Sequence, residues 1–263
     1  MPVSFALDGR SILVTGANSG IGRRIAIYLA QQGADVAVHY LEKTSTKPGE
    51  HHTALGRAAA DEVVHEIRGL GRRGVALAGD LALPESAAAI LAAAEEQLGP
   101  LYGLVNNAAH CQLPDTLLEA GWDGYRNHFD VNLGAPALMM GEFARRCRDR
   151  GQRTGRIVNI STDSARAFPG QVFYGASKAA LEATTRAAAI ELGPLGVTVN
   201  AVAPGPVQTG WIDDALAEQV IPTIPVRRLG LPQDIADAVA FLMSDTASWI
   251  SGQIIQVAGG HAL

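Results

Sequence analysis

The stretch "VTGANSGIG", Val14 to Gly22, decides the fold, because it joins a short apolar run to a helical pattern through a glycine-rich turn. Gly16, Gly20 and Gly22 have no Cβ atom, so the backbone of the turn can approach a pyrophosphate group closely. The following helix N-terminus offers free N–H groups and a partial positive charge. The strand-turn-helix context predicts a dinucleotide-binding turn, made by Gly16, Asn18, Ser19, Gly20, Ile21 and Gly22.

Short apolar runs recur along the chain and alternate with helical patterns. Ile21, Ile25 and Leu29 are spaced as on one helix face, and Pro232 opens a later helix. The runs lie at 12–14, 36–38, 75–77, 104–105, 157–160, 197–202 and 254–257. They are apolar throughout, which is typical of strands buried on both faces of a parallel sheet. The sequence therefore predicts the α/β class: a single doubly wound, Rossmann-type domain over residues 1–263, with a seven-stranded parallel sheet flanked by helices.

The composition limits the kinds of partner. Hydrophobic residues make up 48% of the 263 residues, and charged residues make up 18%, below the roughly 25% of ordinary soluble domains. A surface so poor in charge suggests contact with other subunits. The net charge of −5 gives no reason to expect a nucleic-acid partner. We interpret the basic cluster from Ala144 to Arg153 as a solvated helix C-terminus, where cations suit the helix dipole.

The cysteines and the chain's polar segments indicate a cytoplasmic protein without a metal site. Cys111 and Cys147 show no CxxC spacing, which argues against disulfides and zinc. No signal-peptide pattern is present, and no apolar stretch approaches the ~20 residues that a membrane span needs. The polar connection from Leu41 to Gly56 is unusually long. We interpret its His51 and His52 as exposed residues rather than metal ligands.

The residue at the end of the second apolar run bears on the choice between NADP and NAD. An NAD site usually has an acid there, which accepts hydrogen bonds from the ribose hydroxyls, and here the residue is Tyr40. Without that acid, less negative charge repels a 2′-phosphate, and Lys43, Lys47 or Arg23 could attract it. The sequence therefore favours NADP, while nearby Glu42 keeps NAD possible.

Tyr174 and Lys178 are spaced so that both side chains lie on one helix face. A free phenol has a pKa near ~10, and a fixed ammonium nearby favours the phenolate and lowers that pKa. The small residues between them leave room for a cofactor ribose and a substrate. The pair therefore predicts a tyrosine that exchanges protons near neutral pH.

Several motifs together resemble those of the classical short-chain dehydrogenase/reductase family, in the branch labelled 3-oxoacyl-acyl-carrier-protein reductase-like. They follow the family's order and spacing over essentially the full length: "TGANSGIG", "GDL" at Gly79 to Leu81, "NNAA" at Asn106 to Ala109, "DVNLGA" with Asn132, "IVNIST", Tyr174-x-x-x-Lys178 and "APGPVQTGW". The resemblance implies an NADP(H)-dependent oxidoreductase that transfers a hydride between nicotinamide and a ketone or secondary alcohol, with a 3-oxoacyl thioester as one option. It also implies a homotetramer.

The resemblance implies roles for individual residues. Tyr174 would exchange a proton with the carbonyl oxygen, and Lys178 would hold the nicotinamide ribose and lower the tyrosine pKa. Ser161 would orient the carbonyl, and Asn132, at a local break in its helix, would position a water. The cofactor-binding residues that it implies are Asp80 and Leu81 at the adenine, Asn106 and Ala108 at the riboses, and Pro204, Gly205, Val207 and Thr209 at the nicotinamide.

Two counts give different residues for the carbonyl-orienting hydroxyl. Counting from the apolar run gives Thr162, whereas counting thirteen residues back from Tyr174 gives Ser161. We favour Ser161, because the two hydroxyls must meet on one oxygen. The expected substrate wall is mainly apolar, with Phe168, Val172, Val207 and Trp211, and with Arg166, Gln112 and Gln208 as polar contacts.

Fold alone does not establish function, so two other functions stay open. One is an NAD-dependent alcohol dehydrogenase, and the other is a non-catalytic dinucleotide-binding regulator. The joint presence of Asn132, Ser161, Tyr174 and Lys178 favours a catalyst over the regulator.

Overall fold

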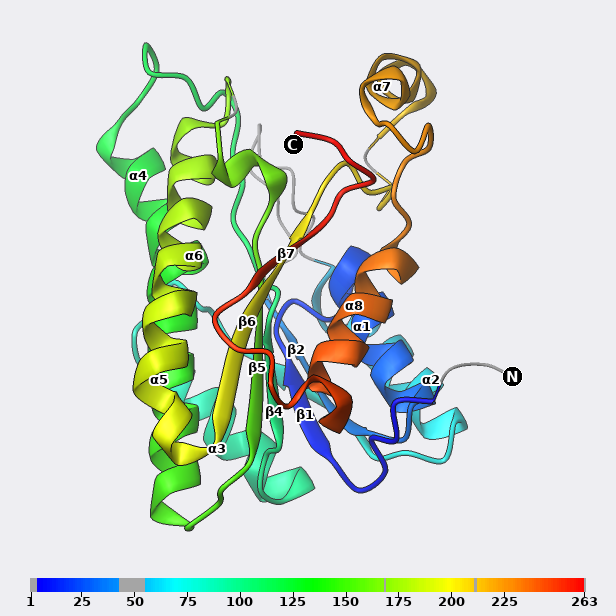
Figure 1. Ribbon diagram of the computed structural model, residues 1–263, viewed down its shortest axis with the longest axis vertical. Helices are drawn as coiled ribbons and strands as arrows, with labels where there is room; N and C mark the ends of the chain where they lie inside the picture. Colours follow the sequence, from blue (N-terminus) through cyan, green and yellow to red (C-terminus); the bar gives the residue numbers. More distant parts are fainter. Residues whose placement is uncertain (1–3, 43–54, 168, 211, 263) are drawn as a thin grey trace.

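A seven-stranded parallel sheet forms the centre of the molecule (Figure 1). The computed structural model describes residues 4–42, 55–167, 169–210 and 212–262. The strand order is β3-β2-β1-β4-β5-β6-β7, and every neighbouring pair is parallel. The strands are β1 Ser11–Val14, β2 Asp35–Tyr40, β3 Gly74–Ala78, β4 Gly103–Asn106, β5 Gly155–Ile160, β6 Val197–Pro204 and β7 Ile254–Val257. Each predicted apolar run lies within one of these strands, so the predicted sheet is confirmed.

Helices cover both faces of the sheet. The α-helices are α1 Gly20–Gln31, α2 Gly56–Gly69, α3 Ser86–Leu98, α4 Trp122–Phe129, α5 Ala135–Asp149, α6 Val172–Leu192, α7 Asp214–Val220 and α8 Pro232–Met243. The helices α1, α2 and α8 pack on one face, and α3, α5 and α6 pack on the other (Figure 1). A π-helical turn, η1 Asp130–Gly134, joins α4 to α5, and short 3₁₀ turns are η2 Asp163–Ala165, η3 Gly193–Leu195, η4 Ile221–Thr223 and η5 Asp245–Ala247.

The hydrophobic core has two parts, one on each face of the sheet. One cluster gathers Val36, Val38 and Ile25 beneath α1, α2 and α8, and the other gathers Leu13 and Leu104 beneath α3 and α5. Burial on both faces explains why the strands read as continuous apolar runs. None of the helices in the described ranges is long and apolar enough to cross a membrane.

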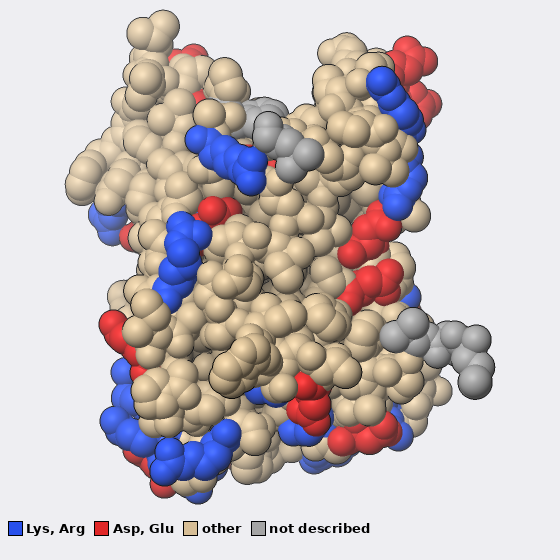
Figure 2. All heavy atoms as spheres, in the orientation of Figure 1, with Lys and Arg blue, Asp and Glu red and all other residues tan. Residues whose placement is uncertain are grey.

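The chain crosses from one half of the sheet to the other between β3 and β4, so the strand order reverses between the neighbouring strands β1 and β4. This reversal places a crevice at the carboxyl ends of the strands. The segment before α4 rises on one side of that end and α7 rises on the other (Figure 1). Figure 2 shows the molecule hollowed at the same end, between these two projecting parts.

The basic cluster lies on the last turns of α5 and in the loop that follows. Arg146 pairs with Glu95 at 3.1 Å and with Glu142 at 2.8 Å, and Arg150 pairs with Glu95 at 2.5 Å. These arginines stabilise a helix end through neighbouring carboxylates, in agreement with the interpretation from the sequence.

Candidate active site

A cavity of about 930 Å³ lies at the carboxyl ends of the strands. Segments that follow β1 to β6 all contribute to its lining, as a doubly wound sheet requires at its switch point. Sixteen of the predicted site residues line it together: Gly16, Asn18, Ser19, Gly20, Ile21, Gly22, Asp80, Leu81, Ala108, Ser161, Tyr174, Lys178, Pro204, Gly205, Val207 and Thr209. Tyr40, Asn106 and Asn132 do not line it.

The glycine turn fits a pyrophosphate group. A Cβ atom on Gly22 would lie 2.2 Å from the Gly16 carbonyl oxygen, so only glycine allows this close approach. Gly16 itself has a φ of +60°, which favours glycine. Ser19, the N-cap of α1, makes no side-chain capping bond, so the first N–H groups of α1 stay available for an anion.

Asn107 holds this turn in place. Its backbone N–H donates to Thr15 Oγ1 at 2.9 Å, and its Nδ2 donates to the carbonyl oxygens of Thr15 and Gly16 at 2.8 and 3.1 Å. Asn106, which was expected at the riboses, does not bring its side chain into the cavity. The Asn106 side chain turns into the sheet, where its Nδ2 donates to Asn159 Oδ1 at 2.8 Å. The motif "NNAA" contains both asparagines, and strand alternation sends only one toward the cavity.

His39 connects the glycine turn to the end of β3. The Gly16 N–H donates to His39 Nδ1 at 3.2 Å, and His39 Nε2 lies 3.2 Å from the Gly79 carbonyl oxygen. Because Nδ1 accepts, Nε2 carries the proton and donates to Gly79. Burial lowers the pKa of His39 to about 4, so the ring stays neutral at physiological pH. No motif in the sequence indicated this residue.

Tyr40, which was expected at the ribose end of the site, also keeps its side chain out of the cavity. Its side chain is buried, and its hydroxyl donates to Glu42 Oε2 at 3.0 Å and is hydrogen-bonded to Arg57. His39 and Leu41 line the cavity instead, because neighbouring residues of a strand point to opposite faces.

Of the cations expected at the 2′-phosphate, Arg23 forms an ion pair with Glu66. Lys43 and Lys47 lie outside the described residues, as do His51 and His52.

The helix that carries the tyrosine begins against a buried carboxylate. Asp115, only 4% exposed, accepts the N–H groups of Phe173 and Tyr174 at 2.9 Å each. A negative charge at a helix N-terminus suits the dipole, so Asp115 fixes the start of α6. A Cβ atom on Gly175 would lie 2.7 Å from the Ser164 carbonyl oxygen, so glycine lets α6 pack closely against η2.

The structure brings Thr162, not Ser161, to the tyrosine. The Thr162 side chain lies close enough to the Tyr174 hydroxyl to oppose the rise of its pKa, whereas Ser161 Oγ donates to Glu182 Oε1 at 2.8 Å. This arrangement favours Thr162 over Ser161 as the hydroxyl next to the tyrosine. The strand β5 ends at Ile160 and determines on which face each following side chain lies. The spacing from Thr162 to Tyr174 is twelve residues, one fewer than the family's common thirteen.

Lys178 and Tyr174 are both buried, and burial moves their pKa values in opposite directions. Lys178 Nζ donates to the Ile160 carbonyl oxygen at 2.7 Å, and burial lowers its pKa to about 8. Burial raises the pKa of Tyr174 above its usual range, the nearby Cys111 and Asp163 add to the rise, and the Thr162 side chain opposes it. The predicted lowering of the tyrosine pKa is therefore wrong for the groups present. Tyr174 carries its proton at neutral pH.

Asn132 lies in the π-helical turn η1, so the expected local break in its helix is confirmed. Its Nδ2 donates to the His110 carbonyl oxygen at 2.9 Å and to Ser177 Oγ at 3.0 Å, and its Oδ1 accepts the His110 N–H at 2.7 Å. The fully buried side chain thus connects the segment after β4 to α6, one residue before Lys178.

The substrate side of the cavity differs from the expected wall. Val207 lines it as predicted, while Phe168 and Trp211 lie outside the described residues. Val172, Arg166, Gln112 and Gln208 do not line it, and Gln208 Nε2 donates to Ile212 O within its own loop. Apolar residues that the sequence analysis missed line it instead: Leu113, Val131, Ile212, Leu216 and Val220. Leu113 and Ile212 lie in loops, Val131 lies in the π-helical turn η1, and Leu216 and Val220 lie in the short helix α7, so no periodicity distinguished them.

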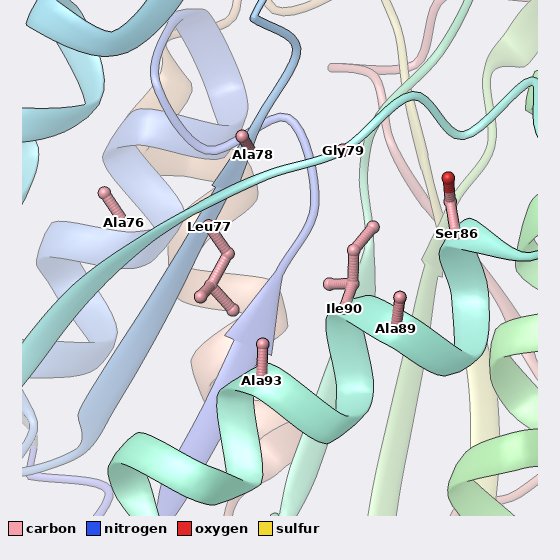
Figure 3. A pocket seen from close by; sticks show the side chains of 8 residues that line it. All are labelled: Ala76, Leu77, Ala78, Gly79, Ser86, Ala89, Ile90 and Ala93. Atoms are coloured by element: carbon pink, nitrogen blue, oxygen red, sulfur yellow. The ribbon is translucent and has the colours of Figure 1, made fainter.

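A second hollow, of about 350 Å³, lies between β3 and α3 (Figure 3). Figure 3 shows small or apolar side chains around it, among them Ala76, Leu77, Ile90 and Ala93. It has no titratable side chain and cannot supply acid–base chemistry. Among the described residues, no group of three or more histidine, cysteine, aspartate or glutamate side chains could hold a metal ion.

Known proteins are similar over nearly the whole chain. Residues 16–262 match the model of a family described as enoyl-(acyl carrier protein) reductase. The 3-oxoacyl-[acyl-carrier-protein] reductase FabG of Staphylococcus aureus is 39% identical over 260 residues, which cover 95% of this chain and 97% of that protein.

Solved structures are also similar over nearly the whole chain. A blue fluorescent protein from a metagenomic library, in complex with NADPH, has a TM-score of 0.85 at 32% identity, covering 98% of this chain and 100% of that one. A 7α-hydroxysteroid dehydrogenase, complexed with NADH and 7-oxo glycochenodeoxycholic acid, has a TM-score of 0.86 at 32% identity, covering 98% and 96%.

Proposed function

The chain belongs to the short-chain dehydrogenase/reductase family of oxidoreductases, and from this premise we propose that it interconverts ketones and secondary alcohols with NADP(H). The observation that carries the proposal is the convergence of Thr162, Tyr174 and Lys178 on one cavity, next to a glycine turn that fits a dinucleotide. The catalytic residues in this proposal are Thr162, Tyr174 and Lys178, with Asn132 as a positioning residue.

The mechanism follows from the protonation states of these groups. When bound, the nicotinamide cofactor supplies or accepts the hydride. The Thr162 hydroxyl holds the substrate carbonyl oxygen beside the phenol. Tyr174 carries its proton at neutral pH and donates it to that oxygen during reduction. Lys178, one helical turn further along and held by the Ile160 carbonyl oxygen, stabilises the phenolate that remains.

The decisive experiment is the oxidation of NADPH in the presence of a panel of ketones and 3-oxoacyl thioesters, with the reverse reaction measured on secondary alcohols. We expect turnover of at least one ketone class. Tight cofactor binding without turnover in either direction would contradict the proposal and favour a non-catalytic dinucleotide-binding regulator.

The preference for NADP over NAD is a separate proposal. At the end of β2, the described residues that line the cavity are His39 and Leu41, and neither is acidic. Glu42, the acid that could serve NAD, is held by the Tyr40 hydroxyl. Fluorescence titration should therefore give a lower Kd for NADPH than for NADH, and equal or reversed values would contradict the preference.

A substitution at Leu41 tests the same point. Leu41→Asp places a carboxylate where it repels a 2′-phosphate and accepts from ribose hydroxyls, so it should shift the preference toward NADH. Leu41→Asn is the matched control, because it has nearly the same shape and no charge. A similar shift in both variants would show that charge is not the cause.

The apolar wall formed by Leu113, Ile212 and Val220 supports a medium-sized ketone substrate, with a 3-oxoacyl thioester as one option. The relative FabG is named for the latter class. An NAD-dependent alcohol dehydrogenase is the alternative activity, and the same titrations and assays decide between them.

We also propose a single domain that assembles as a homotetramer, through α5 and α6, in the cytoplasm. Within "ALMM", Met139 and Met140 are buried in the core, but Leu138 is 45% exposed on α5, and Ile190 is 79% exposed on α6. Such exposed apolar side chains suit a subunit interface. Light scattering at micromolar concentration should give a tetramer, and a monomer would contradict the proposal.

A further inference from the structure

The segment that follows β7 folds back over the loop between β5 and α6. His261 Nδ1 lies 2.5 Å from Asp163 Oδ2, and the backbone N–H of His261 donates to the Ala258 carbonyl oxygen at 3.0 Å. Arg166 Nη1 donates to the Ala262 carbonyl oxygen at 3.3 Å. Figure 1 shows this last part of the chain, in red, rising to the cavity end of the sheet. Residues far apart in the sequence thus form one wall of the cavity.

The contact with Asp163 determines which ring nitrogen of His261 serves the cavity. The Asp163 side chain is 6% exposed, and its carboxylate can only accept, so the shared proton belongs to His261 Nδ1. The His261 side chain is 14% exposed and lines the cavity. Within the described part of the chain, Nε2 has no hydrogen-bond partner. The ring is therefore held through one nitrogen and offers the other.

The Gln171 side chain is likewise held through one polar atom and offers another to the cavity. Ser164 Oγ donates to Gln171 Oε1 at 2.9 Å, which leaves the amide N–H groups of this cavity-lining residue for a ligand. Asp163 follows Thr162 in the chain, Gln171 precedes Tyr174 by three residues, and all of these residues line the same cavity. The polar groups of His261 and Gln171 thus share this cavity with the proposed catalytic residues.

We infer that His261 is a specificity-determining residue, whose Nε2 binds a hydroxyl group on the carbon next to the reacting carbonyl. The inference rests on the proposed function. A hydroxyl group both donates and accepts, so it pairs with Nε2 whether the ring is neutral or protonated. A methyl group of similar size would leave Nε2 without a partner inside the cavity, which is unfavourable. The substrate class is therefore 2-hydroxy ketones and the vicinal diols formed by their reduction.

The test compares two ketones that differ in one group, 2-hydroxyacetophenone and propiophenone. The ratio of their kcat/KM values is measured for the wild type, for His261→Asn and for His65→Asn. The asparagine amide can replace the Nδ1–H donor to Asp163 but has no counterpart of Nε2. His65, exposed on α2, receives the same substitution as a control. The hydroxyl group makes the ketone intrinsically more reactive in every variant, so the change of the ratio between variants is the readout.

The kcat/KM for the hydroxy ketone divided by that for the plain ketone should fall about tenfold in His261→Asn, as expected for the loss of one hydrogen bond, and should stay at the wild-type value in His65→Asn. An unchanged ratio in His261→Asn, or an equal loss on both ketones as a purely structural role would give, overturns the inference and leaves the proposed function intact. If the wild type reduces neither these two ketones nor any ketone of the panel, the proposed function fails, and the inference fails with it.

Discussion

Replacing Thr162 with valine tests which hydroxyl orients the substrate carbonyl. Valine keeps the shape of threonine and removes the hydroxyl, which lies beside Tyr174 and accepts the Ser164 N–H at 3.2 Å. Removing one preorganised donor to a reacting oxygen costs about 10²–10³ in kcat, or ~2.7–4 kcal/mol. Since Thr162 lines the cavity beside the tyrosine, we expect a loss in that range, with cofactor affinity preserved.

Ser161→Ala should affect stability rather than catalysis, because Ser161 Oγ donates a hydrogen bond to Glu182 Oε1. Loss of one such hydrogen bond costs about 0.5–1.5 kcal/mol, or up to ~3 kcal/mol when the partner is charged, and this cost falls on the stability of the protein. We expect a Tm lower by a few degrees and a kcat within about fivefold of the wild type.

The assay is kcat/KM on one accepted ketone for both variants and for Thr162→Ser, with cofactor Kd and Tm measured separately. Thr162→Ser should restore most of the activity, since it restores the hydroxyl. An inactive Ser161→Ala together with a nearly normal Thr162→Val would refute the reasoning from strand alternation and restore the count from Tyr174.

Three further predictions follow from other contacts of the site. Gly22→Ala should abolish cofactor binding in a titration, because its Cβ would lie 2.2 Å from the Gly16 carbonyl oxygen, while Gly69→Ala, with open space around it, should leave the cofactor Kd unchanged. Asp115→Ala removes the acceptor at the start of α6 and should cost about 0.5–2 kcal/mol of unfolding free energy as well as kcat, and an unchanged Tm would contradict the capping role. Burial lowers the pKa of Lys178 from 10.5 to about 8, so between these two pH values the unfolded chain binds more protons than the folded protein. The free energy of unfolding should therefore rise with pH through that window. A normal lysine pKa in a titration of the Lys178 13Cε signal of the cofactor-free protein would contradict this.

The sheet was predictable because its strands are buried on both faces, so their apolar runs contrast with everything around them. The glycine turn was predictable as well, because only glycine allows the contact between Gly22 and Gly16. Sequence could predict which segments form the site but not always which side chain of a segment points into it. In place of Tyr40 and Asn106, their neighbours His39, Leu41 and Asn107 line the cavity, because side chains alternate in direction along a strand.

Other parts of the site have no local signal in the sequence. Asp115 acts on α6 from a loop 58 residues earlier in the chain, and His261 meets Asp163 across 98 residues. His39 is one residue of a strand, and only the folded sheet brings its ring between Gly16 and Gly79. Such partners are determined by tertiary packing, which a pattern of spacings does not contain.

The central claim is that Tyr174 transfers the proton, and Tyr174→Phe tests it most directly. The variant keeps the ring and its packing and removes the hydroxyl, which lies beside Thr162. A general acid typically contributes about 10²–10⁴-fold, so kcat/KM on an accepted ketone should fall by that factor, while the Kd for NADPH stays within about threefold of the wild type. Full activity in Tyr174→Phe would contradict the account.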